Sequence, residues 1–171
     1  KMNSLVDPEI IEALYAASQS GVRIDLNIRG ICCLRPGVKG LSENITVVSI
    51  VDRFLEHARL AYFHQGGDSV LFLSSADWMP RNLDRRIELL IPINAPGPRE
   101  RVMQILEAAF RDNVQARQLL LDGTYRCLTP GKGAEPYRSQ EELYKFARRL
   151  ARQERQHRRG VFEPQRAKHR A

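Results

Sequence analysis

Strict alternation of hydrophobic and polar residues over positions 22–29 is the feature that most constrains how this chain folds. Every second residue there is hydrophobic, and those positions are Val22, Ile24, Leu26 and Ile28. Successive side chains of a β-strand point to opposite faces of a sheet, so the pattern predicts a half-buried strand. The domain must therefore contain a sheet with one face against a hydrophobic core.

Three segments carry the signals of α-helices. The pair Asp7-Pro8 is typical of a helix start, and hydrophobic residues then recur at helical spacing. Pro98 opens a second helical pattern, and Ser139 with Glu142 forms a capping-box sequence before a third. The predicted helices cover residues 8–20, the segment that begins at Pro98, and residues 139 to about 155.

Short hydrophobic runs separated by glycine-containing turns predict β-hairpins. Gly66-Gly67 separates one pair of runs and Asp122-Gly123 separates another. A short helix is predicted over residues 49–55. The predicted strands, besides residues 22–28, cover residues 45–48, 59–64, 70–73, 86–92, 116–121 and 124–128. Helices that alternate with strands and hairpins predict an α/β domain with a mixed β-sheet flanked by helices.

The net charge of +7 is concentrated at one end of the chain. Residues 126–171 hold 13 of the 27 Lys and Arg residues and 5 of the 20 Asp and Glu residues, a local charge of +8. With 171 residues the chain is long enough for one domain, which we assign to residues 1–155. Residues 156–171 form a basic tail that we expect to be disordered. Because the body is neutral, a nucleic-acid-binding function would have to rest on this tail alone.

Several function classes are excluded by composition. No run approaches the ~18 hydrophobic residues of a membrane-spanning helix, and Asp7 and Glu9 interrupt any signal-peptide pattern. The cysteines Cys32, Cys33 and Cys127 lack metal-ligand spacing and fit reduced thiols. No protein-held metal is predicted, and we expect a cytoplasmic location.

Arg29 is the first candidate binding residue. It ends the predicted strand and precedes a glycine-bearing loop, and strand ends are where α/β proteins place ligands. Its guanidinium offers a rigid fork of donors for phosphate oxygens. A surface arginine paired with an acidic neighbour is the simpler alternative.

His57 and Arg59 form a second candidate. They lie two residues apart at the start of a predicted strand, so both side chains share one face. A histidine beside a fixed cation can hold or protonate a phosphate oxygen. A partly buried histidine that donates to a backbone carbonyl is the alternative on local sequence alone.

Further polar residues follow the predicted hairpin. Ser75 and Asp77 lie where the returning strand ends, beside His57 at the start of its partner. They can orient the histidine or receive phosphate, and a simple capping loop is equally compatible with them. Arg81 and Arg86 come next, as part of an anion pocket or of a solvated face.

Five runs of the sequence resemble a known family, the large bacterial polyphosphate kinases, whose last domains have a phospholipase D-like fold. The runs are KMNSLVD at 1–7, IRGIC at 28–32, LSENI at 41–45, RFLEHAR at 53–59 and SSADWMPRN at 74–82. The resemblance covers nearly all of residues 1–150. It implies one half of a phospholipase D-like arrangement.

That family reversibly transfers the terminal phosphoryl group of ATP to inorganic polyphosphate through a phosphohistidine. The resemblance implies that Arg29 and His57 contact the nucleotide phosphates, with His57 as the second active-site histidine. It also implies phosphate binding by Arg59, Arg81 and Arg86 and supporting roles for Ser75 and Asp77. Phospholipase D-like sites carry a lysine where this chain has Arg59, so the roles of Arg59 and Asp77 stay open. Mg²⁺ would accompany ATP as part of the substrate.

The nucleophilic histidine of the family lies in the preceding domain, and no segment here matches it. We therefore expect a C-terminal fragment that is inactive alone and works with upstream domains of the same enzyme. The implied partners are ATP or ADP and polyphosphate, in a homo-oligomeric full-length enzyme. Its expected location is the cytoplasm, with peripheral attachment to the inner membrane as an alternative.

Two other functions remain open on the sequence. The first is a phospholipase D-like phosphodiesterase half-site, in which His57 from two chains would meet. The second is a non-catalytic module that binds polyanions through the basic tail.

Overall fold

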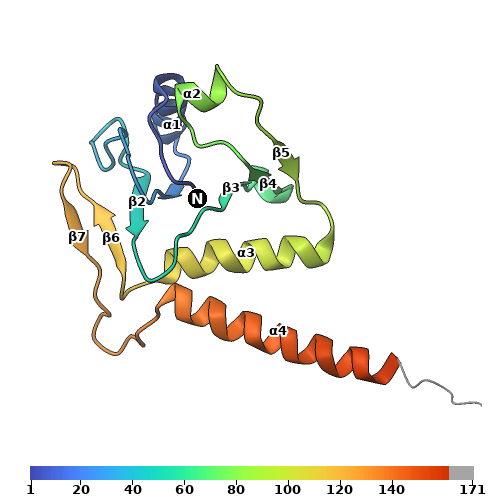
Figure 1. Cartoon of the computed structure of the whole chain (residues 1–171). Helices are drawn as coiled ribbons and strands as arrows, with labels where there is room; N and C mark the ends of the chain where they lie inside the picture. Colours follow the sequence, from blue (N-terminus) through green and yellow to red (C-terminus); the bar gives the residue numbers. More distant parts are fainter. Residues whose placement is uncertain (162–171) are drawn as a thin grey trace, which may run out of the picture.

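In a computed structural model, residues 1–161 are described, with side chains described to residue 155 (Figure 1). The expected tail, residues 156–171, therefore falls largely outside the described part. The helices are α1 (Pro8–Gln19), η1 (Gln65–Gly67), α2 (Pro80–Leu83), α3 (Pro96–Arg111) and α4 (Ser139–Val161). The strands are β1 (Ile24–Asn27), β2 (Ile45–Ile50), β3 (Arg59–Phe63), β4 (Val70–Ser74), β5 (Leu90–Pro92), β6 (Ala116–Leu119) and β7 (Tyr125–Cys127).

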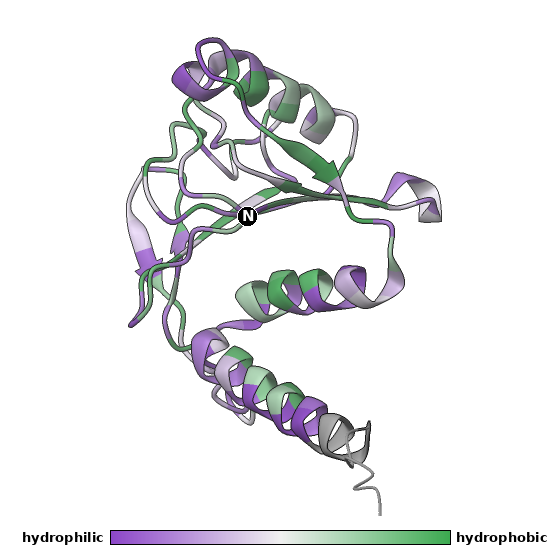
Figure 2. Cartoon of the chain, turned by 45° about the vertical axis from the view of Figure 1, so that its right-hand side comes forward, coloured by the Kyte–Doolittle hydropathy of each residue, from purple (hydrophilic) through white to green (hydrophobic). Residues whose placement is uncertain are grey.

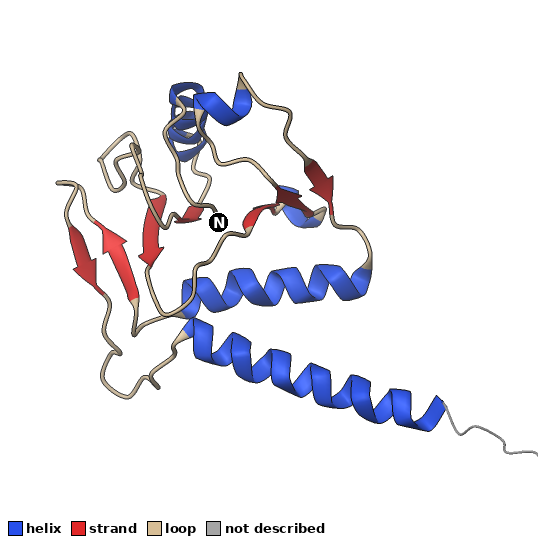
Figure 3. Ribbon diagram, viewed as in Figure 1, coloured by secondary structure: helices blue, strands red, loops and turns tan. Residues whose placement is uncertain are grey.

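The strands form two sheets flanked by helices, which confirms the α/β class (Figure 3). One is a mixed sheet in the order β1-β2-β6-β7, in which β1 and β2 are parallel and the other pairs antiparallel. The other is an antiparallel sheet in the order β3-β4-β5. Both predicted hairpins are present, β3-β4 and β6-β7.

The first six residues join the two sheets. The amide of Met2 donates to Asn27 O at 2.9 Å, and the amide of Leu60 donates to Lys1 O at 2.8 Å. Leu5 pairs with Cys32 on one side and with Trp78 on the other. The N-terminal segment thus lies between β1 and β3, at the centre of the view in Figure 1.

Helices cover the sheets from two sides, with α1 above the strands and α3 below them in Figures 1 and 3. The apolar side of α1 packs on a core shared by the N-terminal segment, β1 and β2; its fully buried members include Leu5, Ile28 and Val47. The lower core joins β3 and β4 to α3 through Leu60, Leu71 and Leu106. The helix α4 packs against α3.

Some predicted boundaries were wrong. Residues 49–55 do not form a helix, because Ser49 and Ile50 stay in β2 and pair with β6. Tertiary pairing therefore overrides the local capping signal. The strand predicted from residue 86 begins only at Leu90, α3 begins at Pro96, and α4 continues to Val161.

The predicted capping box at the start of α4 is replaced by a longer-range contact. The Ser139 hydroxyl donates to Asp112 Oδ2 at 2.8 Å, and Glu142 accepts a hydrogen bond from Lys145. Asp112 Oδ1 accepts three more backbone N–H groups, from Val114, Gln115 and Ala116. Asp112 therefore fixes the end of α3 to the start of α4.

Candidate active site

His57 and Arg59 lie on the same face at the start of β3, as predicted. The Arg59 guanidinium donates to His57 Nε2 at 3.2 Å and to the His57 carbonyl oxygen at 3.3 Å. A guanidinium can only donate, so Nε2 is the acceptor in this contact. His57 is exposed, which leaves its other ring edge accessible to a ligand.

Asp77 holds Arg59 from the opposite side. Arg59 Nε and Nη2 donate to the two carboxylate oxygens of Asp77, each at 3.1 Å. The carboxylate is buried, and its Oδ1 also accepts the backbone N–H groups of Asn3 and Ser4 at 2.8 and 3.1 Å. Burial raises the pKa of Asp77, but the Arg59 hydrogen bonds and these backbone donors outweigh it, and the net pKa is lowered.

Asn3 connects Arg29 to the same group. Its side-chain Oδ1 accepts from Arg29 Nε and Nη2 at 2.9 and 2.6 Å, while its backbone N–H donates to Asp77. Because the Asn3 amide is neutral, it orients the guanidinium without cancelling its charge. Five residues therefore form one chain of contacts, which we call the Arg–His network: Arg29, Asn3, Asp77, Arg59 and His57.

Asn3 has no part in the residue-by-residue site prediction, because nothing in its local pattern points to chemistry. The signal that could have found it is its place in the first run of the family resemblance. Gly30 makes its position possible, since a Cβ at Gly30 would lie 3.1 Å from the Asn3 carbonyl oxygen.

Ser75 lies near the network but binds elsewhere. Its hydroxyl donates to Glu88 and accepts the Leu89 N–H at 2.9 Å. Glu88 also accepts from the buried Asn82 at 2.6 Å. The hydrogen bonds from Ser75 and Asn82 lower the pKa of Glu88, against partial desolvation and with help from nearby Arg86 and Arg59. Glu88 is thus a carboxylate near the site that the sequence reading missed.

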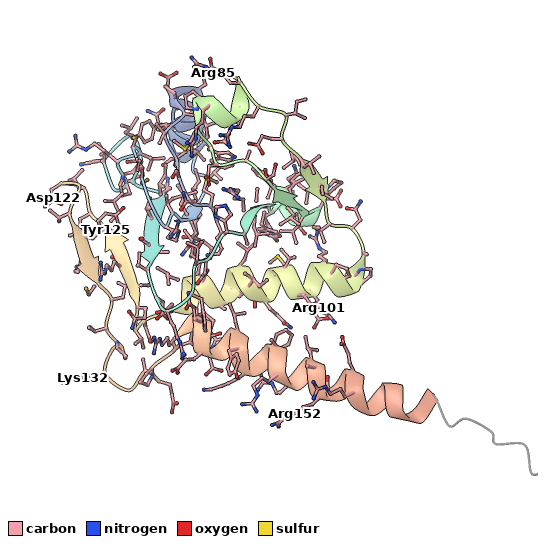
Figure 4. The ribbon with its side chains drawn as sticks, in the orientation of Figure 1. Arg85, Arg101, Asp122, Tyr125, Lys132 and Arg152 are labelled. Carbon is pink, nitrogen blue, oxygen red and sulfur yellow. The ribbon has the colours of Figure 1, made fainter. Side chains whose placement is uncertain are left out.

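Arg81 and Arg86 remain outside the network. Arg81 lies in α2, Arg86 lies in the loop before β5, and both side chains are exposed. No hydrogen bond joins either of them to the described residues of the Arg–His network. Figure 4 shows the neighbouring Arg85 at the outer end of α2, at the edge of the molecule.

The start of α4 holds the segment that precedes His57. Gln140 makes two hydrogen bonds to the backbone of Phe54 and donates to Glu56 Oε1 at 2.9 Å. Arg138 binds both oxygens of Asp52, at 2.5 and 2.9 Å. Figure 1 shows the chain after β2 descending to the junction of α3 and α4 before it rises into β3. The approach to His57 is therefore fixed by contacts far away in sequence.

The Arg–His network contains two guanidinium groups and one carboxylate. Within residues 1–155, no three His, Cys, Asp or Glu side chains gather in a way that could hold one. The three cysteines are free thiols. No helix in the described residues is long and apolar enough to cross a membrane.

Two guanidinium groups and an imidazole, organised around one buried carboxylate, suit an oxyanion such as phosphate.

Comparisons with known proteins identify relatives of this chain. The chain is 61% identical over 144 residues to the polyphosphate kinase of Rhodopirellula baltica, covering 84% of this chain and 17% of that protein. It is 54% identical over 143 residues to the polyphosphate kinase of Pseudomonas aeruginosa, covering 84% of this chain and 21% of that protein. The chain thus spans about a fifth of the length of these curated relatives.

A solved structure and a family match complete the comparison. The crystal structure of polyphosphate kinase from Porphyromonas gingivalis superposes with a TM-score of 0.81 at 42% identity, covering 86% of this chain and 22% of that one. Residues 1–140 match the family described as polyphosphate kinase C-terminal domain 2. The chain therefore belongs to the polyphosphate kinase family, as its C-terminal domain 2.

Proposed function

We propose that this domain binds nucleotide phosphates during reversible phosphoryl transfer between ATP and inorganic polyphosphate. The observation that carries the proposal is the Arg–His network. It joins Arg29 and His57, which lie 28 positions apart in the sequence, through Asn3, Asp77 and Arg59. Phosphoryl transfer depends chiefly on positioning and on neutralising phosphate charge, and such a network supplies both.

In the proposed reaction, Arg29 binds phosphate oxygens while a second histidine, from another part of the enzyme, attacks the terminal phosphorus of ATP. A nitrogen–phosphorus bond forms, the bridging phosphorus–oxygen bond breaks, and ADP leaves with the bond's electron pair. A terminal oxygen of polyphosphate then attacks the phosphohistidine, which lengthens the chain and restores the free histidine. His57 holds the transferred phosphate or donates a proton to the leaving oxygen.

Arg59 has a different role in this proposal. Its Nη2 is shared between Asp77 and His57, at 3.1 and 3.2 Å, so its donors are largely engaged before a ligand arrives. We assign it as a positioning residue that fixes the His57 ring. Asp77 in turn holds Arg59, and Arg81 and Arg86 would contribute only to the outer electrostatic field.

The remaining components of the reaction lie outside this chain. ATP would enter with Mg²⁺ as part of the substrate, since the described residues offer cations rather than metal ligands. The nucleophilic histidine would come from an upstream domain, so we propose that the chain alone does not complete the reaction. Assembly into homo-oligomers and a cytoplasmic location belong to this same proposal.

The direct test replaces His57 with alanine in the polyphosphate kinase that contains this domain. ATP-dependent growth of polyphosphate should fall by a factor of about 10² or more, which is typical of a lost acid–base residue. His64→Ala is the matched control, because His64 is also an exposed histidine at the other end of β3.

Near-normal turnover in the His57→Ala enzyme would contradict the assignment. Hydrolysis of a simple phosphodiester by the isolated 171-residue chain would instead favour the phosphodiesterase half-site.

A further inference from the structure

The helix α4 carries a one-sided row of cations that the proposed active site does not use. Lys145, Arg148, Arg149, Arg152 and Arg155 all have exposed side chains. They are three residues apart, except for the adjacent Arg148 and Arg149, and at 100° per residue all five lie within an arc of about 120° around the helix. The row extends over about 15 Å of the helix axis, at 1.5 Å per residue. We call this surface the basic face of α4.

The opposite side of α4 is occupied by the fold. Leu143, Phe146 and Leu150 recur at helical spacing and are half-buried, and α4 packs against α3. Glu154 forms an ion pair with Arg101 of α3 at 3.6 Å. Figure 2 shows hydrophobic and hydrophilic residues alternating along α4. In Figure 4, Arg101 lies on the α3 side of the helix pair and Arg152 on the side of α4 away from α3.

Most of the positive charge on this face is uncompensated. Glu142 pairs with Lys145, Glu141 pairs with Arg138, and Glu154 is drawn toward α3. Within the described part of the chain, no carboxylate lies within ion-pair distance of Arg148, Arg149, Arg152 or Arg155. Four adjacent guanidinium groups on one helix repel one another. A polyanion bound along the row would relieve this repulsion, so we expect such a row to bind one.

We propose that the basic face of α4 is a docking surface for inorganic polyphosphate, separate from the Arg–His network. Polyphosphate is a linear polyanion with closely spaced charges, and a straight row of cations along a helix matches that shape. A compact anion such as ATP would contact only one or two members of the row. The choice of polyphosphate rests on the proposed function, because the chain's relatives are polyphosphate kinases.

Other polyanionic partners fit this surface less well. Single-stranded nucleic acid is held by aromatic side chains interleaved with basic ones. Of the described residues from 143 to 155, Tyr144 and Phe146 are aromatic; Arg148 already covers the ring of Tyr144, and Phe146 belongs to the half-buried face. A membrane surface would require a free apolar face on the helix, and that face packs on α3.

The helix also connects this surface to the catalytic segment. Its first turn contains Gln140, which binds the backbone of Phe54 three residues before His57. A polyphosphate chain held along α4 would therefore be tethered to the element that positions His57. Tethering keeps the acceptor chain near the enzyme between successive additions, because rebinding becomes intramolecular.

The test compares polyphosphate binding by two charge-matched variants of the full 171-residue chain. One carries R148Q, R149Q, R152Q and R155Q, and glutamine preserves the helix because it is a good helix former. The control carries R23Q, R117Q, R126Q and K132Q, four exposed cations elsewhere on the surface. Titration calorimetry with long-chain polyphosphate, between about 50 and 200 mM salt, gives the affinity and its salt dependence.

We expect the α4 variant to lose about tenfold or more in affinity at low salt. Its plot of log affinity against log salt should become shallower by about 3, because four counterion-releasing contacts are lost. The control should stay within about twofold of the parent chain. Circular dichroism should show equal helix content in all three proteins.

Three results would overturn the proposal. Equal losses in both variants would mean that binding follows net charge alone, and no loss in the α4 variant would mean that polyphosphate binds elsewhere. If the parent chain binds single-stranded DNA with the same number of phosphates as tightly as polyphosphate or more tightly, the partner is a different polyanion. The His57→Ala test is independent, because that variant should still bind polyphosphate through α4 even if the catalytic assignment fails.

Discussion

The side-chain amide of Gln140 is paired with the backbone of Phe54 in both directions. Gln140 Oε1 accepts from Phe54 N at 2.8 Å, and Gln140 Nε2 donates to Phe54 O at 2.9 Å. The amide thus imitates a neighbouring β-strand for a segment that has no strand partner of its own. This contact, 86 residues apart in sequence, holds the approach to His57.

Replacing Gln140 with leucine should loosen that approach. Leucine has no hydrogen-bonding group, so the Phe54 N–H and C=O groups would lose their partners. Because the Gln140 side chain is buried, we expect the free energy of unfolding to fall by about 2 kcal/mol. In the polyphosphate kinase that contains this domain, turnover should fall about tenfold by misplacement of His57. Steady-state kinetics and urea unfolding measure the two effects.

Gln19→Leu is the matched control for that change, because Gln19 makes one exposed hydrogen bond to the Gly40 carbonyl oxygen. It should leave both quantities nearly unchanged. Loss of stability without loss of turnover in Gln140→Leu would show that the amide does not position His57.

Arg59→Lys tests whether geometry or charge matters at the site. Lysine keeps the charge but cannot bind both Asp77 oxygens and His57 Nε2 at once. We expect about a tenfold fall in turnover and about 1–2 kcal/mol lower stability. Arg23→Lys, at an exposed ion pair with Asp25, should have little effect on either measurement. Full activity in Arg59→Lys would mean that charge alone suffices.

The lowered pKa of Asp112 predicts that the domain loses stability in acid. Burial raises the pKa of Asp112, but hydrogen bonds from Ser139, Gln115 and Val114 lower it more, and the net pKa lies below the ordinary value of 3.8. The unfolded chain therefore takes up a proton first as the pH falls. The stabilisation is complete above about pH 4 and declines below it, until the folded-state pKa is reached.

Asp112→Asn should remove part of this acid sensitivity. The amide cannot accept all five hydrogen bonds, so we expect about 3 kcal/mol lower stability at pH 7 and a smaller further loss as the pH falls below about 4. Unfolding by urea across this pH range measures both. An unchanged acid slope in the variant would assign the sensitivity to other carboxylates.

Gly30→Ala tests the close approach of the N-terminal segment. The added Cβ would meet the Asn3 carbonyl oxygen at 3.1 Å, and that oxygen is held in place by the Gly30 N–H at 2.8 Å. We expect about 1–2 kcal/mol lower stability from this overpacking, and weaker phosphate binding because Asn3 orients Arg29. Thermal unfolding measures the stability of this variant and of its control, Gly131→Ala. The control should be about as stable as the parent chain, because the added Cβ enters open space. A neutral Gly30→Ala would show that the segment moves freely.

Local sequence patterns predicted many of the elements correctly. The Asp7 cap forms as expected, with its carboxylate accepting the Ile10 N–H at 3.0 Å. The Asp122-Gly123 turn forms as well, with Gly123 at a φ of 84°, a conformation that glycine adopts without strain. These signals succeed because they depend on neighbours within a few residues.

The candidate site was predictable only in part. The two-residue spacing placed His57 beside Arg59, and the hairpin brought Asp77 to the same end of β3. Asn3 and Gln140 were missed, because Asn3 lies 74 residues from Asp77 and Gln140 lies 84 residues from Glu56 along the chain. Glu88 was missed because it belongs to no motif, and its hydrogen bonds with Ser75 and Asn82 are visible only in the structure.

The sequence by itself determined the α/β class, the hairpins and the pairing of His57 with Arg59. It also singled out Arg29 as a candidate, from its place at a strand end and from the family resemblance. Tertiary structure alone decided that residues 1–6 bridge the two sheets and that Asn3 couples Arg29 to Asp77. It also decided that β2 continues through Ser49 and Ile50. The physical reason is the range of the interactions: turns and caps are satisfied locally, whereas a buried carboxylate or an unpaired backbone edge finds its partner only when distant segments are packed together.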